Sequence, residues 1–525
     1  MKRINIIKSI LFTSTIILGV SCTNLDEEVL DGVVISSTGG STVNSASLLV
    51  SAYEGLRGFQ DQDKMFALDE MSTDALVGPT RGGDWDDNAK WRQLHTHTWA
   101  PDNIEIRNAW NSLLSQVYNC NLVIENGTAT QIAQARFLRA FYYYNVIDLY
   151  GQAPYREAGS SLEADPKVWT RQEATAFVIS ELEAIIGSLP TRSTDASIVN
   201  VDAAHFLLAK LYLNKGVFNA TDAAGPYTFD PADMTKVVTH VGAINSSLAP
   251  DYWDNFKPTN NESPEILFSS KNIRGGQGGG IQSRWRMGMH YQQTPDGWNG
   301  FATVAEYYNK FDENDRRIKN SDQYIIDAFG NNVGFQVGQM KNGKNRDEFG
   351  RDKDASGALY TNIPAGTVNL KDRKGNPLFF TAALTLITGG ATLETAGIRS
   401  QKYIPDVDNL GTPENDYVLM RYSDALLMKA EAVLRSNSGG SVVAIMTAIA
   451  TRSGQSPSPA TLEGVYLERG KELWYEGWRR NDMIRFGKFL EARELKPYVS
   501  DNRYVLFPVP ADALFNANLK QNPGY

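Results

Sequence analysis

The chain has 525 residues, of which 42% are hydrophobic and 21% charged, and its formal net charge is −9. This composition excludes a largely disordered chain, and the acidic balance argues against a general nucleic-acid-binding protein, whose affinity depends on a dense basic face. The length predicts roughly two to four domains or an extended array, and the two cysteines exclude a disulfide scaffold and a cysteine-based structural zinc site.

The first 21 residues predict an export signal. Positively charged residues precede an apolar stretch at residues 10–20, which is too short to span a bilayer comfortably. The stretch ends in Leu-Gly-Val-Ser before Cys22, which resembles a bacterial lipobox, where the cysteine thiol is lipidated. We therefore predict a lipoprotein signal at residues 1–21 and a lipidated tether at residues 22–40. A plain signal peptide with an incidental Cys22 is the alternative.

Helical periodicity dominates much of the chain after residue 100. Apolar residues recur every three or four positions, and Gly or Pro follows each of the first four runs. The runs predict helices at residues 103–125, 129–150, 171–189, 202–215, 417–435 and 442–451. Small residues such as Ala203 and Ala209 allow neighbouring helices to approach closely, as stacked helix-turn-helix repeats require. We therefore expect helical repeats over approximately residues 103–250 and 417–490.

The sequence changes character between about residues 250 and 415. Glycine, asparagine, aspartate and aromatic residues crowd together, and turn pairs such as Asp296-Gly297 interrupt the helical pattern. A shorter segment of the same kind runs from residue 78 to residue 101. We predict long loops and short strands laid over the helical scaffold, which is the usual location of binding residues. Because no clean linker divides the chain, we expect a single body at residues 41–525.

The C-terminal part carries the most specific motifs. Residues 417–432 read YVLMRYSDALLMKAEA, residues 468–487 read ERGKELWYEGWRRNDMIRFG, and the chain ends with FPVP at residues 507–510 and NLKQNPGY at residues 518–525. Together they resemble the RYADVLLMYAEA helix, the ER..EL..EG.R..DL.R.G stretch and the closing PIP … NP.L.QNPGY segment of the SusD/RagB family. The lipobox and the GWNG segment at residues 297–300 fit the same pattern, so the resemblance covers essentially the whole chain.

This resemblance implies a mainly α fold, in which a tetratricopeptide-like helical repeat scaffold carries a loop-rich, irregular ligand-binding face. It also implies a lipid-anchored protein on the outer membrane at the cell surface, closing like a lid over a SusC-like TonB-dependent transporter. The expected function is the non-catalytic binding of oligosaccharide or polysaccharide and its delivery to that transporter. Uptake of peptide or glycopeptide, as in RagB-like members, is an alternative, and a surface glycosidase is a second one.

Acidic and basic residues alternate at helical spacings near the C-terminus. We expect these residues to form interlocked ion pairs that hold the last helices together. They are Glu468, Arg469, Glu472, Glu476, Arg479, Arg480, Asp482 and Arg485.

The sequence carries no recognisable catalytic motif. It has no G-x-S-x-G, H-E-x-x-H or P-loop pattern, although its 60 acidic residues leave glycosidase-type carboxylate pairs open. His95 and His97 would place two imidazoles on one face of a strand, but the chain's five scattered histidines predict no zinc site. Acid-rich loops at residues 61–63 and 84–87 could hold a structural calcium ion. Neither has the EF-hand spacing, so we expect solvated loops and no cofactor.

One loop offers the residue types of a carbohydrate site. Sugars present apolar C–H faces and a rim of hydroxyls, so their sites combine aromatic rings with amide, carboxylate and guanidinium groups. Residues 81–88 read RGGDWDDN. A tryptophan flanked by glycines and acids is poorly suited to a core. We therefore predict Trp85 as a ligand-binding residue, together with Asp84 and Arg81.

A second set of candidates lies at residues 284–299, which correspond roughly to the family segment that supplies binding aromatics. From this segment we predict Trp285, Tyr291 and Trp298 as ligand-binding residues, and for Trp298 a structural turn is an equal alternative. Cys120 is expected to be a buried small hydrophobic residue. The remaining tryptophans are expected to pack in the core: Trp91, Trp99, Trp110, Trp169, Trp253, Trp474 and Trp478.

Overall fold

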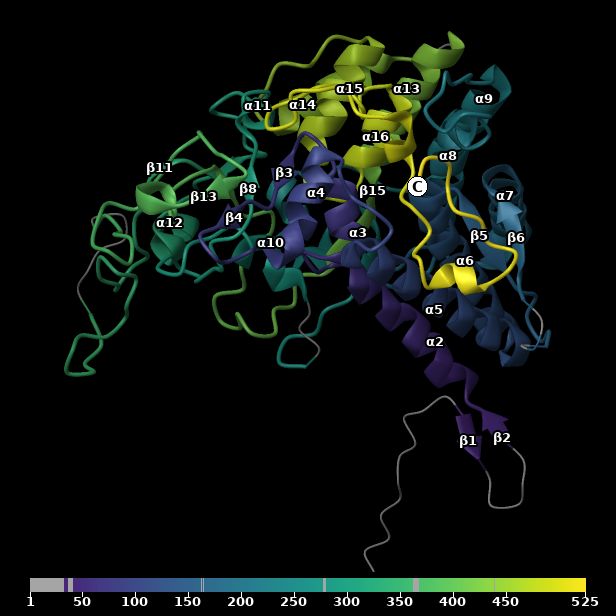
Figure 1. Cartoon of the computed structure of the whole chain (residues 1–525), viewed down its shortest axis with the longest axis horizontal. Helices are drawn as coiled ribbons and strands as arrows, with labels where there is room; N and C mark the ends of the chain where they lie inside the picture. The colour runs from purple at the N-terminus through teal and green to yellow at the C-terminus, as the bar shows by residue number, and fades with distance from the viewer. Residues whose placement is uncertain are drawn as a thin grey trace, which may run out of the picture.

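The computed structural model describes residues 33–35, 41–161, 163, 165–276, 280–361, 368–438 and 440–525. The predicted signal at residues 1–21 and the predicted lipidation site Cys22 lie outside these residues. Helices form one side of the molecule, and loops with short strands form the other (Figure 1). At the N-terminal end of the described chain, strands β1 (Val33–Ile35) and β2 (Ser41–Val43) pair antiparallel and precede helix α2 (Ser45–Glu54).

The first part of the helical scaffold consists of α5 (Ile104–Asn126), α6 (Ala129–Tyr150), α7 (Arg171–Ile185), α8 (Val201–Phe218) and α9 (Pro231–Ala243). Consecutive helices pack against each other, and strands β5 (Gln152–Tyr155) and β6 (Lys167–Thr170) pair between α6 and α7. Helices α6 and α7 each begin with a capping box, formed by Thr128 with Gln131 and by Thr170 with Glu173. The four helices predicted here are confirmed, whereas α9 was not predicted as a separate helix.

The C-terminal helices complete the scaffold. They are α13 (Tyr422–Ser436), α14 (Val442–Arg452), α15 (Leu462–Glu472) and α16 (Arg479–Arg485). Helix α13 packs on α9 and so joins this group to the first part. None of the helices in the described residues is long and apolar enough to cross a membrane.

The predicted start of the helix at residue 417 is wrong. Residues Tyr417–Arg421 form strand β15, which pairs antiparallel with β7 (Ile266–Ser270), and the helix begins at Tyr422. Every residue of both strands is buried. A short apolar run that is buried on both faces has no alternating pattern, so periodicity alone does not distinguish it from a buried helical turn.

The loop-rich side is built from short elements. Its strands are β8 (Ala302–Thr303), β9 (Lys319–Asn320), β10 (Val333–Gln336), β11 (Gly338–Gln339), β12 (Phe379–Phe380), β13 (Ile387–Thr388) and β14 (Arg399–Ser400), and its helices are α10 (Ser283–Arg286), α11 (Ala305–Tyr308) and α12 (Gln323–Phe329). The predicted loop-rich face on a helical scaffold is therefore confirmed.

Segments from the N-terminal half extend into this side. Helix α3 (Lys64–Phe66) precedes strand β3 (Leu76–Val77), which pairs antiparallel with β8. Strand β4 (Thr80–Arg81) pairs in parallel with β13, and helix α4 (Lys90–Thr96) follows it. These pairings bring residues near 80 next to residues near 300 and 390.

The residues that we predicted to be buried lie in the core. Cys120 is fully buried, as predicted. The tryptophans predicted to pack inside are also buried: Trp91, Trp99, Trp110, Trp169, Trp253, Trp474 and Trp478. Because aromatic side chains bury large apolar areas, these rings contribute strongly to the stability of the scaffold.

Buried ion pairs connect the last helices, as predicted, although most of them join different segments and few lie along one helix. Arg421 pairs with Glu265, Glu472 and Glu476 at 2.6–2.9 Å. Arg485 pairs with Glu431 at 2.8 Å and with Asp482 at 2.6 Å. Further pairs join Arg317 to Glu468, Arg469 to Asp424 and Asp482, Arg479 to Asp74, and Arg480 to Asp148.

Candidate functional site

Strand β4 ends in a tight turn that presents Asp84 and Trp85. The backbone N–H of Arg81 donates to the carbonyl of Asp84 at 2.8 Å, and the N–H of Asp84 donates to the carbonyl of Arg81 at 2.9 Å. Gly82 has a φ of 63°, which costs glycine little, whereas Trp85 has a φ of 61°, which is rare for a bulky residue. The turn leaves Asp84 exposed and Trp85 partly exposed.

The ring of Trp85 is held by three neighbouring groups. Its centroid lies 4.8 Å from that of Phe301 and 6.3 Å from that of Trp91. Its Nε1–H donates to the carbonyl of Trp298 at 3.3 Å. A Cβ atom at Gly300 would lie 2.6 Å from Cε2 of Trp85, so only glycine at this position allows the ring to lie where it does. Trp85 is therefore fixed before any ligand arrives.

The GWNG segment at residues 297–300 is a structural turn that also leaves a ring partly exposed. A Cβ atom at Gly297 would lie 2.2 Å from the Met289 carbonyl oxygen, and Asn299 has a φ of 52°. Trp298 is partly exposed. Its ring centroid lies 6.5 Å from that of Trp85, and the two ring planes differ by 38°. The structural-turn reading of this motif is therefore confirmed, and ligand binding by Trp298 stays a prediction.

Tyr291 contributes a third partly exposed ring, and Arg373 lies over it. The guanidinium carbon of Arg373 is 4.5 Å from the ring centroid of Tyr291, which is a cation–π distance. The Nε–H of Arg373 donates to Oε1 of Glu394 at 2.6 Å, and Nε2 of His290 lies 2.8 Å from Oε2 of the same carboxylate. Glu394 thus orients the guanidinium beside Tyr291.

Glu394 is ionised in this arrangement. Burial raises the pKa of its carboxyl group, but the hydrogen bonds from His290 and Arg373 outweigh burial and lower the pKa to about 2. Burial lowers the pKa of His290 despite its contact with Glu394. The anchor of Arg373 is therefore a carboxylate at neutral pH.

We call Trp85, Tyr291 and Trp298 the aromatic cluster. Burial raises the pKa of Tyr291, and the charges of Arg373 and Asp84 also act on it, in opposite directions. Arg373 therefore lies against Tyr291, and Asp84, which precedes Trp85 in the chain, is near enough to act on the Tyr291 hydroxyl group. Partly exposed rings beside a carboxylate and a guanidinium provide apolar faces together with hydrogen-bond acceptors and donors.

The prediction for Trp285 is wrong. The side chain is fully buried in the core beside α10, so it offers no surface to a ligand in this conformation. The prediction followed from the correspondence of this segment with the family segment that supplies binding aromatics. The neighbouring Arg284 is also buried. Its guanidinium carbon lies 3.4 Å from the ring centroid of Phe66, and it donates to the carbonyl of Phe59 at 2.9 Å.

Arg81 is also buried and does not face the surface, which contradicts its predicted contact with ligand. Its Nε–H donates to the carbonyl of Gly300 at 2.6 Å, and its Nη groups donate to the carbonyls of Leu393 at 3.3 Å and Ala396 at 3.1 Å. The guanidinium holds three loops together behind the aromatic cluster. Arg81 thus positions Trp85 and Trp298 and does not bind ligand directly.

His95 and His97 lie at the end of helix α4 and not on a strand, as the sequence had suggested. Burial, followed by the charge of Arg493, lowers the pKa of both imidazoles. Their Nε2 atoms lie 2.9 Å from the carbonyl oxygen of Glu494 and 2.8 Å from that of Ser72, respectively. Within the described residues, no group of three or more His, Cys, Asp or Glu side chains is arranged to hold a metal ion.

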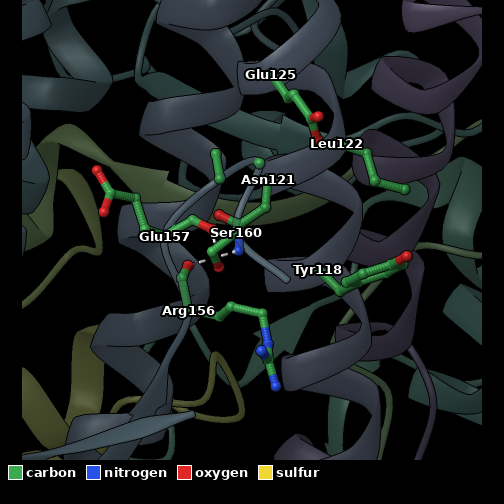
Figure 2. A pocket seen from close by; sticks show the side chains of 9 residues that line it. Tyr118, Asn121, Leu122, Glu125, Arg156, Glu157 and Ser160 are labelled. Atoms are coloured by element: carbon green, nitrogen blue, oxygen red, sulfur yellow. Dashed lines mark hydrogen bonds between the residues drawn. The ribbon is translucent and has the colours of Figure 1, made fainter. Parts of the chain in front are cut away.

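A separate pocket of about 210 Å³ lies between α5 and the loop after β5 (Figure 2). Tyr118 and Glu125 line it together with Asn121. The amide of Asn121 donates to the carbonyl of Arg156 at 3.1 Å and accepts from Nη1 of Arg139 at 2.7 Å. The amide groups of Asn121 are therefore already hydrogen-bonded within the protein. None of the predicted ligand-binding residues lines this pocket. It belongs to the helical side, whereas β4 lies on the loop-rich side (Figure 1).

The roles of Arg373, Glu394 and Gly300 could not be predicted from the sequence. Arg373 lies in a polar segment, Asp-Arg-Lys-Gly-Asn, that reads as an ordinary turn. About 80 residues separate it from Tyr291 in the sequence. The final glycine of GWNG has the pattern of an ordinary turn residue, although it is the residue that leaves room for the ring of Trp85.

Comparison with known proteins supports the fold and the family. Residues 245–525 match the family model described as the SusD family, and residues 31–213 match a model described as starch-binding associating with outer membrane. The starch-binding protein SusD of Bacteroides thetaiotaomicron is 25% identical to this chain, over 94% of this chain and 90% of that protein.

Solved structures show the same architecture. A SusD superfamily protein from Parabacteroides distasonis superimposes with a TM-score of 0.68 at 19% identity, covering 92% of this chain and 98% of that one. A laminarin-binding SusD-like protein superimposes with a TM-score of 0.66 at 18% identity, covering 92% and 99%. Since the first family model alone spans more than half of the 525 residues, this chain belongs to the SusD family.

Proposed function

We propose that this protein binds oligosaccharide or polysaccharide at the cell surface, without catalysis, and delivers it to a SusC-like TonB-dependent transporter in the outer membrane. The observation that carries the proposal is the aromatic cluster, which is partly exposed beside Asp84 and Arg373 on the loop-rich face. A relative named for starch binding and a structural neighbour named for laminarin binding support a sugar as the ligand.

The geometry of the cluster suits a sugar chain. Trp85 and Trp298 offer apolar faces for the C–H groups of sugar rings, and Asp84 and Arg373 provide an acceptor and a donor for hydroxyl groups. Phe301 and Gly300 fix Trp85, and Glu394 fixes Arg373. Because these side chains are ordered before binding, less conformational entropy is lost when the ligand arrives.

The charges around the cluster favour binding over hydrolysis. A glycosidase needs a carboxylic acid whose pKa is raised, so that it can protonate the leaving group. Glu394 is the buried acid beside Tyr291, and hydrogen bonds from His290 and Arg373 lower its pKa to about 2. It is therefore ionised at neutral pH and cannot serve as the general acid of a glycosidase.

The proposed location follows from the N-terminal sequence. Residues 1–21 would be removed as a signal, Cys22 would carry the lipid anchor, and residues 22–40 would tether a single body formed by residues 41–525. Several acyl chains on one residue suffice for stable membrane attachment. Ligand that contacts both this protein and the transporter would favour the closed form of their complex.

The test uses protein that begins after Cys22. Electrophoresis through gels that contain starch, laminarin or other polysaccharides should retard it, and incubation should release no reducing sugar. A peptide library on the same array tests the alternative of peptide uptake. Retention by peptides alone, or release of sugar, would contradict the proposal. If polysaccharide binds and Trp85→Ala has full affinity, glycan binding stands and the site assignment fails.

A further inference from the structure

The charged groups that act on Tyr291 differ in their exposure. Three guanidinium groups, those of Arg81, Arg373 and Arg399, act electrostatically on its hydroxyl group. The carboxylates that act on it are Asp84 and Glu394. The positive and negative groups around Tyr291 therefore differ in how deeply they are buried and in how they are paired.

Two of these guanidinium groups are buried without a countercharge. Arg81 and Arg399 are 2% and 0% exposed, and within the described residues each donates to backbone carbonyls only. Burial lowers the pKa of Arg81 to about 9 and that of Arg399 well below its ordinary value, and no carboxylate in the described part of the chain offsets either shift. A buried charge is screened less by salt than an exposed one, so its field reaches the nearby surface.

The third guanidinium is available to a ligand. Arg373 is about half exposed, and its Nε–H is occupied by Glu394 while its plane lies over the ring of Tyr291. The contacts found among the described residues engage its backbone N–H and Nε–H, and both Nη groups are left without one. A guanidinium fixed in this way presents two N–H groups in the fork geometry that suits a carboxylate or a sulfate.

Two further pairs of charges near the cluster compensate each other, whereas the exposed carboxylate of Asp87 accepts from Nε1 of Trp91 at 2.7 Å and has no ion pair within the described residues. Arg286 lies 3.6 Å from Asp296, and Arg92 lies 2.7 Å from Asp86. His290 is buried, and burial lowers its pKa, so it adds little positive charge at neutral pH. Of the two carboxylates that act on Tyr291, Glu394 accepts a hydrogen bond from Arg373, and Asp84 is exposed.

We propose that the ligand of the aromatic cluster carries an anionic substituent, either the carboxylate of a uronic acid or a sulfate ester, and that Arg373 binds this group above the buried Arg81 and Arg399. This inference rests on the proposed glycan-binding function and narrows its substrate class. The sugar rings stack on Trp85 and Trp298, and the anion lies beside Tyr291.

The test compares sugars that differ in charge. Oligogalacturonate and its methyl ester form one pair, and a carrageenan oligosaccharide and its desulfated form make the second. Laminarin and starch oligosaccharides serve as neutral references. Titration calorimetry should show tighter binding to at least one charged member than to its uncharged counterpart, and the pair that does so identifies the substituent. The preference should shrink at high salt concentration, because counterions screen the attraction.

Two variants with opposite expected effects sharpen the test. Arg373→Gln should weaken binding of the charged sugar about tenfold or more, since hydrogen bonds to charged groups are strong, whereas Arg373→Lys should lose less. Asp84→Asn should strengthen binding of the charged sugar, because it removes the opposing carboxylate. Lys374→Gln is the matched control, as it removes an exposed neighbouring charge and should change nothing.

The outcomes separate this inference from the proposed function. If only neutral sugars bind, or if Arg373→Gln binds the charged sugar like the wild type, the inference is overturned and glycan binding stands. If no sugar in the panel binds at all, both fail. A melting temperature of Arg373→Gln equal to that of the wild type excludes unfolding as the cause of lost affinity.

Discussion

Buried arginines have different hydrogen-bond partners in the helical scaffold and on the loop-rich side of this molecule. Around the last helices, most of the buried arginines meet a carboxylate: Arg317, Arg421, Arg469, Arg479, Arg480 and Arg485. Arg493, which follows α16, is an exception and donates to backbone carbonyls. On the loop-rich side, Arg81, Arg284 and Arg399 are equally buried and donate to backbone carbonyls instead.

The two arrangements have different consequences for charge. Burial lowers the pKa of Arg485, but Glu431 and Asp482 outweigh burial and raise it above its ordinary value. For Arg399, burial and the neighbouring Arg81 both lower the pKa. In the scaffold, the opposite charges of each ion pair therefore cancel, and the pairs hold helices together. On the loop-rich face, uncompensated positive charge lies beneath the surface that we propose to bind ligand.

The largest effect should come from breaking a pair in the scaffold. Glu472 meets Arg421, Arg452 and Arg317, so Glu472→Gln leaves several buried guanidinium groups short of a countercharge. We expect the free energy of unfolding to fall by about 3–5 kcal/mol, measured by urea denaturation. A loss below about 1 kcal/mol, the size typical of exposed pairs, would show that this network adds little.

On the loop-rich side the largest effect should be on affinity and not on stability. Trp85→Ala removes a partly exposed ring and should weaken sugar binding by about 2 kcal/mol, or roughly 30-fold. Calorimetry measures the affinity. Helical circular dichroism should be unchanged, because the ring lies outside the scaffold. Full affinity in this variant would remove Trp85 from the site.

Gly300→Ala tests whether that ring must be positioned. The added Cβ would meet Trp85 at 2.6–2.7 Å, so the ring has to move. Overpacking of this kind costs about 1–3 kcal/mol, and we expect sugar affinity to drop while Trp85 is still present. An alanine variant with native affinity would mean that the exact place of the ring is unimportant.

The contribution of Glu394, which holds Arg373, to the stability of the protein should be lost in acid. The pKa of Glu394 is lowered to about 2 from the usual value near 4.5, so its contribution to stability is complete above pH 4.5 and is lost as the pH falls toward 2. Thermal unfolding measured from pH 5 to pH 2 should show this loss in the wild type. Glu394→Gln should be less stable at pH 5 and should show a smaller decrease over the same range.

The smallest effect should come from an exposed pair. Arg286 and Asp296 lie 3.6 Å apart at the rim, where solvent screens both charges. Asp296→Asn should change the free energy of unfolding by less than about 1 kcal/mol. A value as large as that for Glu472→Gln would erase the distinction between the two sides of the molecule.

The helices could be predicted from the sequence, because α5 to α8 each have a regular apolar repeat and a clear end. Strand β15 could not, since its five buried residues show no alternation. In the site, the glycines and acids around Trp85 correctly indicated partial exposure. The family correspondence did not locate Trp285, which is buried beside Arg284, and Arg284 itself donates to a carbonyl inside the core. Arg373 and Tyr291 meet through long-range folding of loops, which leaves no local pattern.

The most direct measurement follows individual tryptophans by ¹⁹F NMR in protein labelled with 5-fluorotryptophan, with each signal assigned by a Trp→Phe variant. Addition of a bound oligosaccharide should shift the signals of Trp85 and Trp298 and leave that of the buried Trp285 in place. If the sugar moves other tryptophan signals and leaves Trp85 and Trp298 unchanged, ligand binds elsewhere and the aromatic cluster is not the site.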